Sequence, residues 1–563
     1  MSLLLVLILI PLVAAAIIPA VPRKSWPYPI ALIGTLLSAA VGVVAAFQHD
    51  WLTASGKSEA LAFSAPWMPK LGLSFSLGVN SVSGLLIALT LLLGPICVVA
   101  SRTAITERVR TYYFWLLVLQ AAMVGVFSAR DLVLFYIFFE FTLIPMFVLI
   151  GVYGSTNRRA AAIKFFMYTF TGSVIALAGL LYVAYRHTQA PGNPLHAWSF
   201  DIDTLAATAR AMTTTEQYWV FGALMAGFAV KVPLFPLHTW LPLAHTEAPT
   251  AGSVILAGVL LKLGTYAIYS FVLPFVPAAA FHFAPLIATF AIIGIIAVGL
   301  VCWVQRDVKK LVAYSSVAHL GFCMLGMFAL NITGLKGSVL YMINHGLSTG
   351  AIFLCIGMVY ERYHTRSMDE LGGLAKKMPI WASFMVFFAM ASVGLPMLNG
   401  FVSEFMCLMG AWQASDSWTG WGLTSGTAGV LGPVYATVAG TGMIIAAIYT
   451  LYMIGKVVWG PLHTPGHDGG HGHGHGSEAH GVLPVDLSRR EIGLLLPLAA
   501  CCLLLGLYPK PFLAAIDAST RDTVAVVAAG RNAHAAPSPQ PAAAQGAPAA
   551  QTVSAEPSMQ VTQ

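Results

Sequence analysis

The chain has 563 residues, of which 58% are hydrophobic and only 9% are charged. Because soluble proteins carry about 25% charged residues, this composition excludes an ordinary soluble domain and indicates a membrane-embedded protein. The formal net charge of +7 is spread thinly, which argues against a nucleic-acid-binding protein. The seven cysteines form no CxxC or Cys/His pattern, so a disulfide scaffold, a zinc site and iron–sulfur ligation have no support.

Apolar stretches of membrane-spanning length recur along the whole chain. The first lacks a basic leader and is followed by Arg23 and Lys24, so it predicts a membrane helix rather than a cleaved signal peptide. The fourteen expected spans are residues 2–20, 28–47, 81–101, 111–128, 132–153, 161–185, 217–243, 249–272, 283–303, 308–329, 336–360, 380–412, 430–458 and 491–508. Of the 29 Lys and Arg residues, seventeen follow odd-numbered spans and nine follow even-numbered spans, which predicts that both termini lie outside.

Two of these spans contain helix breakers at matching positions. Pro233 and Pro236 follow Lys231 in the seventh span, and Pro396 and Gly400 precede Glu404 in the twelfth. Irregular backbone at membrane depth survives only within protein or beside a water-filled cavity. Five spans separate the two breaks, so the halves have opposite topology, as in inverted-repeat transporters. The fold class is therefore an all-α polytopic membrane protein of about fourteen helices, with two inverted five-helix repeats and two proline-broken helices.

The expected organisation also includes two segments outside the membrane. A His/Gly-rich loop at 460–490 either captures stray metal or is simply a solvated loop, and alternating glycine argues for the loop. The Ala/Pro/Gln-rich tail at 513–563 is predicted to be disordered. The remaining parts are an N-terminal three-helix segment at 1–110, the repeats at 111–272 and 283–459, and a last helix at 491–508.

Six ionisable side chains from six spans fall at similar membrane depth, where each costs at least about 2.5–3.5 kcal/mol. They are Glu140, Lys231, Lys262, His319, His345 and Glu404. A lone histidine is either a satisfied packing residue or a proton relay, and the nearby hydroxyls fit both interpretations: Ser315, Ser316, Tyr341 and Ser348. Structural ion pairs are the alternative for the two glutamates and two lysines, but buried pairs stabilise little more than apolar packing does. We therefore interpret these residues as functional.

Four segments carry a resemblance to a known family: VKVPLFPLHTWLPLAHTEAPTAGSVILAGVLLKLGTY, KKLVAYSSVAHLGF, YMINHGLSTGAIFL and GLPMLNGFVSEF. Over residues 70–460 the chain resembles the antiporter-like membrane subunits of NADH:quinone oxidoreductase (respiratory complex I), the M type above all. Related families are Mrp-type sodium/proton antiporters and membrane hydrogenases. One departure is Leu243, where the family often has an aspartate, so His238 and Glu247 are candidates to share that role.

The resemblance implies a role for each of the six residues. Glu140 and Lys231 would form the coupling pair, while Lys262, His319 and His345 would form a polar mid-membrane axis. Glu404 would be the exit residue, where the L and N types usually carry lysine. The tail is not expected to form the long lateral helix of the L type.

The implied function is proton translocation as a subunit of complex I in the bacterial inner membrane. Neither cofactor nor metal is expected in this chain, because NADH, FMN, iron–sulfur clusters and quinone would belong to partner subunits. Expected partners are other membrane-arm subunits, including the L and N types, and lipids, with no nucleic acid. The alternatives are an antiporter or hydrogenase subunit of the same fold, a redox or quinone-binding subunit, and a structural spacer. The histidines lack helix-paired spacing for haem, and the charged axis argues against a spacer.

Overall fold

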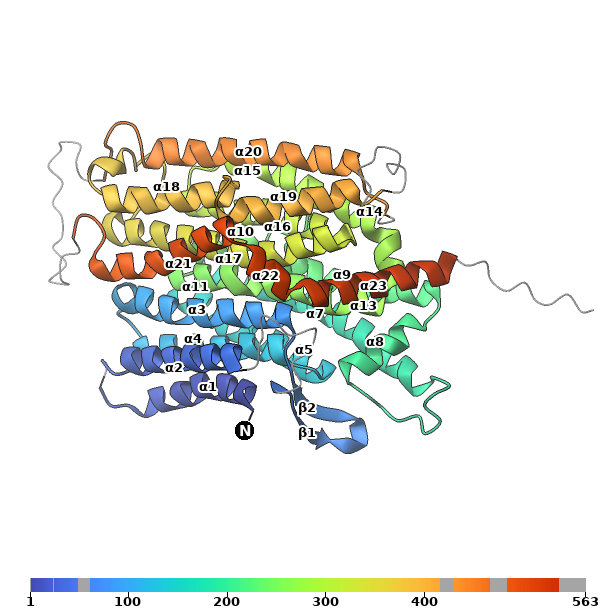
Figure 1. Cartoon of the computed structure of the whole chain (residues 1–563). Coiled ribbons are helices and arrows are strands. Elements are labelled where there is room, and N and C mark those ends of the chain that lie inside the picture. Colours follow the sequence, from blue (N-terminus) through green and yellow to red (C-terminus); the bar gives the residue numbers. More distant parts are fainter. Residues whose placement is uncertain (1, 24, 49–60, 416–428, 466–483, 536–563) are drawn as a thin grey trace, which may run out of the picture.

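The computed structural model describes residues 2–23, 25–48, 61–415, 429–465 and 484–535. Their helices run side by side, with the connecting loops gathered at the two ends of the bundle (Figure 1). The first half contains α1 (Leu3–Ala20), α2 (Pro27–Gln48), α3 (Ser81–Ala104), α4 (Val109–Ser128), α5 (Leu132–Phe141), α6 (Leu143–Tyr153), α7 (Arg158–Thr188), α8 (Ile202–Arg210), α9 (Thr214–Lys231), α10 (Leu241–Glu247), α11 (Thr250–Ile255), α12 (Leu261–Ala267) and α13 (Leu273–Phe275).

The second half continues the bundle and includes α17, the longest helix. It contains α14 (Pro277–Ile293), α15 (Gly299–Trp303), α16 (Val308–Phe328), α17 (Ile332–Tyr363), α18 (Pro379–Val393), α19 (Asn399–Gln413), α20 (Pro433–Val457), α21 (Arg489–Leu507), α22 (Lys510–Ala515) and α23 (Asp517–Ala535). Three π-helical turns interrupt two of the spans: η3 (Leu256–Leu260), η4 (Ile268–Val272) and η5 (Gly294–Val298). Two short 3₁₀ turns, η2 (Pro69–Leu71) and η6 (Leu374–Lys376), lie in loops.

Within the described ranges, twelve helices are long and apolar enough to cross a membrane. They coincide with twelve of the fourteen expected spans. The other two expected spans are the proline-broken ones, which the structure divides into α9–α10 and α18–α19. The prediction of an all-α polytopic membrane protein is confirmed, while the symmetry relating the two repeats stays a prediction.

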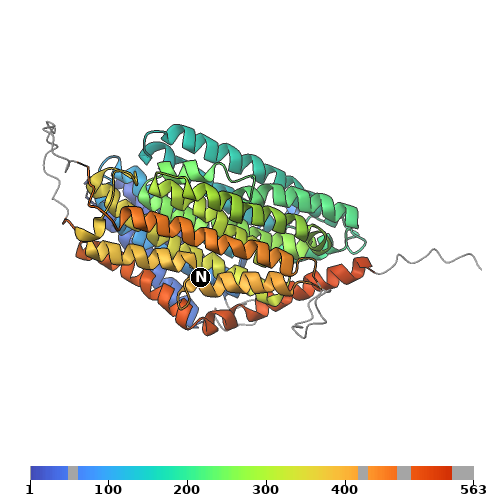
Figure 2. The same ribbon diagram turned by 90° about the horizontal axis from the view of Figure 1, so that it is seen from above.

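The most enclosed helix is α17. Its membrane-length window is 100% buried within the protein, compared with 39% for α20. Viewed from above, α7 runs along one edge of the bundle and the C-terminal helices run along the opposite edge (Figure 2). The polar side chains in this window of α17 are therefore shielded by protein.

The break between α9 and α10 directly follows Lys231. Pro233 and Pro236 supply no N–H there, and the chain continues as a series of turns up to Leu241. The main-chain carbonyl of Val230 is satisfied by the indole N–H of Trp240, at 2.9 Å. The broken helix thus ends in the protein interior without losing all its hydrogen bonds, as irregular backbone at membrane depth requires.

The break between α18 and α19 depends on glycine. Gly394 adopts the left-handed conformation (φ +83°), and the N–H of Leu395 donates to the carbonyl of Met390 at 3.1 Å. This is the usual glycine-terminated end of a helix, and Pro396 then prevents its continuation. A new helix begins at Asn399 and carries Glu404 in its second turn.

The depth of Glu140 is set by the cap at the start of α5. The Asp131 carboxylate accepts hydrogen bonds from the N–H groups of Val133 (2.9 Å) and Leu134 (3.2 Å). Its other oxygen accepts from the N–H of Ser74 at 3.0 Å, which ties α5 to strand β2 (Leu73–Leu77). Strand β2 pairs antiparallel with β1 (Phe63–Met68), a hairpin that the sequence analysis did not predict, as it did not predict α8.

The prediction of a disordered tail from residue 513 is wrong for its first part. Residues 510–535 form α22 and α23, and α23 packs against α14 and α17. This segment has no proline after Pro511, its alanines favour helix, and Val527 is buried. Residues 536–563 and most of the His/Gly-rich loop (466–483) lie outside the described residues.

Candidate functional site

Lys231 lies at the end of α9 and reaches across to α5. Its ammonium Nζ donates to the carbonyl oxygen of Phe139 at 3.0 Å and to the hydroxyl of Thr142 at 3.4 Å. The same Nζ lies 3.5 Å from the centroid of the Phe139 ring, a cation–π contact. The side chain is only 5% exposed, so these contacts replace the water that an ammonium loses on burial.

Glu140 follows Phe139 and is half-buried near Lys231. Among the described residues, no carboxylate oxygen lies within 4.0 Å of Lys231 Nζ, so the two groups interact through space rather than as a contact ion pair. Neither oxygen of Glu140 forms a hydrogen bond of normal geometry with the described chain, although the Ser173 hydroxyl lies nearby. The predicted pair is therefore present as two neighbouring charges with separate surroundings.

Lys262 and His345 form a direct buried contact in the centre of the bundle. Lys262 Nζ lies 2.7 Å from His345 Nδ1, and it also donates to the main-chain carbonyl of Ala257. Both side chains are at most 3% exposed. Because Ala257 belongs to the π-helical turn η3, the local widening of this span brings a carbonyl to the lysine. An ammonium can only donate, so Nδ1 of His345 is then the acceptor.

His319 is the next group along the axis. Its ring centroid lies 6.0 Å from that of His345. Nδ1 of His319 pairs with the hydroxyl of Tyr341 at 3.0 Å, while Nε2 faces the hydroxyls of Ser392 (3.2 Å) and Tyr449 (3.4 Å). Each ring nitrogen thus has a hydroxyl that can donate or accept, so either tautomer is accommodated.

Glu404 is the last of the six residues and is 1% exposed. Neither of its oxygens has a hydrogen-bond partner among the described residues. The carboxylate lies against the helix break, because a Cβ added to Gly394 would come within 2.7 Å of Oε2. Tyr341 and Tyr449 contact His319 and also lie within electrostatic range of Glu404, so both tyrosines neighbour the two groups.

The structure therefore brings Lys262, His345 and His319 together in a buried chain of neighbours, with Glu404 close to Tyr341 and Tyr449, which contact His319. Lys231 and Glu140 form a second centre. The two centres are adjacent, since a Cβ added to Gly264 of α12 would lie 3.1 Å from the main-chain carbon of Lys231. No side-chain hydrogen bond joins Lys231 to Lys262 within the described ranges.

Several polar residues at this site were missed or misplaced by the sequence analysis. Tyr341 pairs with His319 on the neighbouring helix and not with His345, which lies one turn away on the same helix. Three of the expected hydroxyl partners donate to main-chain carbonyls instead: Ser315, Ser316 and Ser348. The residues not singled out are Thr142, His245, Asn344, Ser392, Asn399 and Tyr449.

Asn344 and Asn399 join α17 to the start of α19. The amide of Asn344 donates to the carbonyl of Asn399 at 2.6 Å and to the Ser403 hydroxyl at 3.0 Å, and Asn399 donates back to the carbonyl of Asn344 at 3.2 Å. Because Asn344 precedes His345 and Ser403 precedes Glu404, this reciprocal pair fixes the spacing between the axis and its last residue. The available sequence signal was Asn399, which directly follows the break between α18 and α19.

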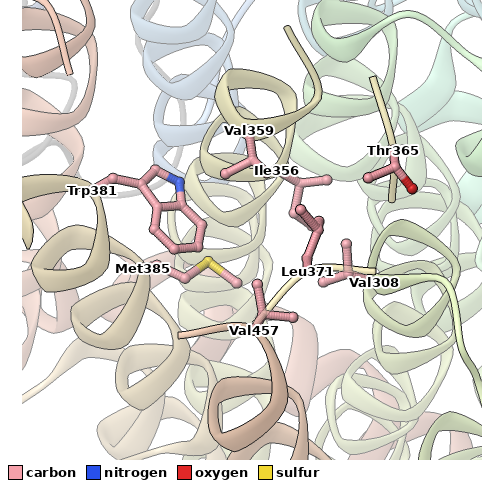
Figure 3. Close-up of a pocket in the computed structure, with 8 residues that line it drawn as sticks. All are labelled: Val308, Ile356, Val359, Thr365, Leu371, Trp381, Met385 and Val457. Atoms are coloured by element: carbon pink, nitrogen blue, oxygen red, sulfur yellow. The ribbon is translucent and has the colours of Figure 1, made fainter. Parts of the chain in front are cut away.

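A small cavity elsewhere in the bundle does not belong to the site. It lies between α16, α17, α18 and α20, and its walls are almost entirely apolar, with Trp381, Met385 and Val457 among them (Figure 3). The indole N–H of Trp381 donates to the carbonyl of Cys355 at 2.9 Å. With that donor satisfied, the cavity offers a ligand little polar contact, and we assign it no role. Among the described residues, no three His, Cys, Asp or Glu gather as a possible metal site.

The chain is similar to known proteins over almost its full length. Residues 129–432 match the family model described as NADH:quinone oxidoreductase/Mrp antiporter, TM. It is 38% identical to NADH-quinone oxidoreductase subunit M of Rhodobacter capsulatus over 518 residues, covering 90% of this chain and 94% of that protein. A chain of Thermus thermophilus respiratory complex I with bound NADH superposes with a TM-score of 0.78 at 27% identity, covering 93% of this chain and 99% of that chain. A chain of the Mrp complex from Dietzia sp. superposes with a TM-score of 0.75 at 21% identity, covering 93% and 98%, which shows a shared fold.

Proposed function

Because the chain belongs to the NADH:quinone oxidoreductase/Mrp antiporter family of membrane proteins, we propose that it is the M-type, proton-translocating subunit of a complex I. The observation that carries this proposal is the buried line Lys262–His345–His319–Glu404 beside the Glu140–Lys231 centre. Ionisable groups this deep in a membrane protein are costly and mark ion or proton pathways. The Glu404 exit position favours the M type over its L and N siblings.

Protons would pass along the line as a shared set. Lys262 and His345 are already in hydrogen-bond contact, so a proton on one can move to the other without rearrangement of the helices. The His319 ring, flanked by hydroxyls on both nitrogens, can accept a proton at one nitrogen and release it from the other. Since such closely spaced groups titrate together, the line holds its protons jointly rather than residue by residue.

The Glu140–Lys231 centre would control when the line is filled. An ionised Glu140 attracts the ammonium of Lys231, whereas a neutral Glu140 does not. The ammonium stays attached to α5 through Phe139 and Thr142 in either case. A change of charge at Glu140 would therefore act on Lys231, whose main chain packs against Gly264, two residues beyond Lys262.

Electron transfer would take place in partner subunits that hold NADH, FMN, iron–sulfur clusters and quinone. Further partners would be other membrane-arm subunits, including the L- and N-type siblings. The site residues described above are suited to proton transfer and not to redox chemistry. The Lys/Arg bias of the loops supports a bacterial inner membrane orientation with both termini on the outer side. A sodium/proton antiporter subunit of the same fold is the second candidate, because the description of the matching family also includes the Mrp antiporters.

The test is proton translocation by the assembled complex in sealed vesicles, driven by NADH oxidation, with Glu404 varied. Glu404→Gln keeps the size of the side chain but cannot ionise, so it should block translocation while native gels show normal assembly. Glu404→Lys should retain measurable translocation, because lysine is also a switchable proton carrier. Glu370→Gln, at an exposed glutamate, is the matched control. Normal translocation by Glu404→Gln would contradict the assigned route, and dependence on sodium rather than protons would favour the antiporter.

A further inference from the structure

A polar hollow of about 350 Å³ lies at the end of the bundle where α4 begins, α6 ends and α7 begins. Three arginines line it, Arg108, Arg158 and Arg159, together with one carboxylate, that of Glu107. We call it the arginine hollow. Among the described residues, none of these three arginines forms an ion pair with a carboxylate, so the hollow has an excess of positive charge. Its loops follow odd-numbered spans, whose Lys/Arg excess marks the inner side of the membrane.

Contacts between the two loops hold the arginines in place. Arg108 adopts the left-handed backbone conformation (φ +47°), and its carbonyl accepts a hydrogen bond from the hydroxyl of Tyr153 at 2.8 Å. Arg158 donates through Nη1 to the carbonyl of Val152 at 3.0 Å, which leaves its other N–H groups for a ligand. Because the hollow is formed before a ligand arrives, little ordering cost opposes binding.

The turn that precedes α7 is also fixed from the protein interior. The carboxylate oxygen Oε2 of buried Glu247 accepts from the hydroxyl of Ser155 at 2.6 Å and from the N–H of Asn157 at 2.9 Å. The main-chain carbonyl of Glu247 accepts from the N–H of Ser155 at 2.9 Å. Since α7 begins at Arg158, these hydrogen bonds set the position of the first turn of the helix and of the arginines that it carries.

An exposed apolar stripe of α7 runs into the membrane from the arginine hollow. Arg159 is followed at helical spacing by Ile163, Met167 and Phe170, so the four residues lie on one face of the helix. The three apolar side chains are 57%, 55% and 42% exposed, in that order. From Arg159 to Phe170 the helix rises by about 16 Å, close to half of the roughly 30 Å hydrocarbon layer. The stripe therefore has the length of one leaflet.

A positive hollow joined to an exposed apolar stripe has the two parts of a phospholipid site. We propose that the arginine hollow binds the phosphate of an anionic phospholipid of the inner leaflet, with an acyl chain along the stripe of Ile163, Met167 and Phe170. Guanidinium groups bind phosphate oxygens through paired hydrogen bonds, and basic pockets between membrane helices hold anionic head groups. A soluble phosphate would use the hollow and leave the stripe uncovered, so a lipid accounts for both features. This goes beyond the proposed function, because it involves no residue of the proton path.

The test identifies the bound lipid by photo-crosslinking in the assembled complex, reconstituted into vesicles of equal parts phosphatidylglycerol and phosphatidylcholine. A benzoylphenylalanine residue replaces Ile163, and mass spectrometry of the irradiated chain gives the ratio of phosphatidylglycerol to phosphatidylcholine adducts. The control position is Leu451 of α20, which is 55% exposed and lies near the end of its helix on the same side of the membrane. The ratio should be at least about fivefold higher at Ile163, since each arginine near a membrane surface changes the affinity for anionic lipid by about that factor.

Removing the charge of the hollow should remove this preference. Arg108→Gln combined with Arg159→Gln keeps the anchored Arg158 and should lower the ratio at the first position to that at the second. The matched control combines Lys376→Gln with Arg489→Gln, which removes two positive charges from exposed side chains at the same end of the bundle. This control should keep the preference of the wild type.

Four outcomes would overturn the proposal. They are equal ratios at Ile163 and Leu451, crosslinking of the Ile163 position to a partner subunit in place of lipid, an unchanged preference in the arginine variant, and loss of the preference in an excess of inorganic phosphate, which would assign the hollow to a soluble phosphate. If the arginine variant does not assemble, the comparison of the two positions in the otherwise unchanged chain decides. No step of the test measures proton translocation, so its failure and failure of the proposed function are distinguishable.

Discussion

Gly227 of α9 permits the close packing that positions Lys231, and replacing it by alanine should disturb both stability and transport. A Cβ at this position would lie 2.6 Å from Ala176 Cβ and 2.6 Å from the carbonyl oxygen of Gly172, both on α7. Since ordinary van der Waals contact needs about 3.5 Å or more, the two helices must separate by roughly 1 Å. Overpacking of this kind costs about 1–3 kcal/mol.

Gly222 of the same helix provides the matched control. A Cβ there meets nothing within 4 Å, so Gly222→Ala should be neutral or slightly stabilising through helix propensity. Gly227→Ala should lower the temperature at which the detergent-purified complex loses its monodisperse elution profile. Because Lys231 follows one turn later, a shift of α9 also lengthens its 3.0 Å contact with Phe139, and proton translocation should fall. Equal melting temperatures for the two variants would refute this account of the α7–α9 contact.

Three further outcomes are expected. Glu140→Gln should impair translocation severely and Glu140→Asp mildly, since only aspartate keeps the charge; equal effects would show that charge is not the reason for Glu140. Arg362 donates two 2.8 Å hydrogen bonds to the buried carboxylate of Glu491. Arg362→Ala leaves that carboxylate buried without its partner, so it should destabilise the complex by about 3–5 kcal/mol in thermal unfolding. A change near zero would contradict this. A hydrogen bond from Arg521 and an ion pair with Lys336 of α17 hold the pKa of Asp517 below its usual value. This anchoring of α23 is therefore fully present above the ordinary carboxyl pKa and is lost as pH falls through the lowered pKa. Proteolysis of α23 in the wild type should increase only at acidic pH, and cleavage that does not depend on pH would contradict the anchor.

Sequence reasoning located the spans and the ionisable residues because both depend on local pattern. A run of apolar residues must cross the membrane, and a proline removes a helical hydrogen bond wherever the helix lies. The distance of Glu140 from the start of α5 follows from the Asp131 cap by simple helix rise. These features need no knowledge of which helices are neighbours.

Contacts between distant spans were not predictable in the same way. Tyr449 reaches His319 across 130 residues of chain, and only the packing of α20 against α16 determines that contact. Helical spacing shows which face a residue lies on, but not which helix covers that face. Helical spacing therefore does not show that Tyr341 pairs with His319, or that His245 lies within electrostatic range of Lys309 and Lys262.

The C-terminal tail is a segment for which local composition led to a wrong prediction. Its composition predicted disorder, yet residues 517–535 form a helix because α13, α14 and α17 provide a surface for it. The hydroxyl of Tyr269 pairs with Ser519, and Thr523 donates to the same hydroxyl at 3.2 Å. Tertiary contacts of this kind decide the structure of segments whose local signal is weak.

The central claim is that protons move through this chain under the control of the Glu140–Lys231 centre. The most direct measurement is the rate of proton translocation and of NADH oxidation by assembled complex carrying Lys231→Ala, with Lys164→Ala on α7 as the control. The account predicts that Lys231→Ala lowers translocation at least about tenfold and slows electron transfer with it, while the control behaves as wild type. Near-normal translocation by a fully assembled Lys231→Ala complex would contradict the account.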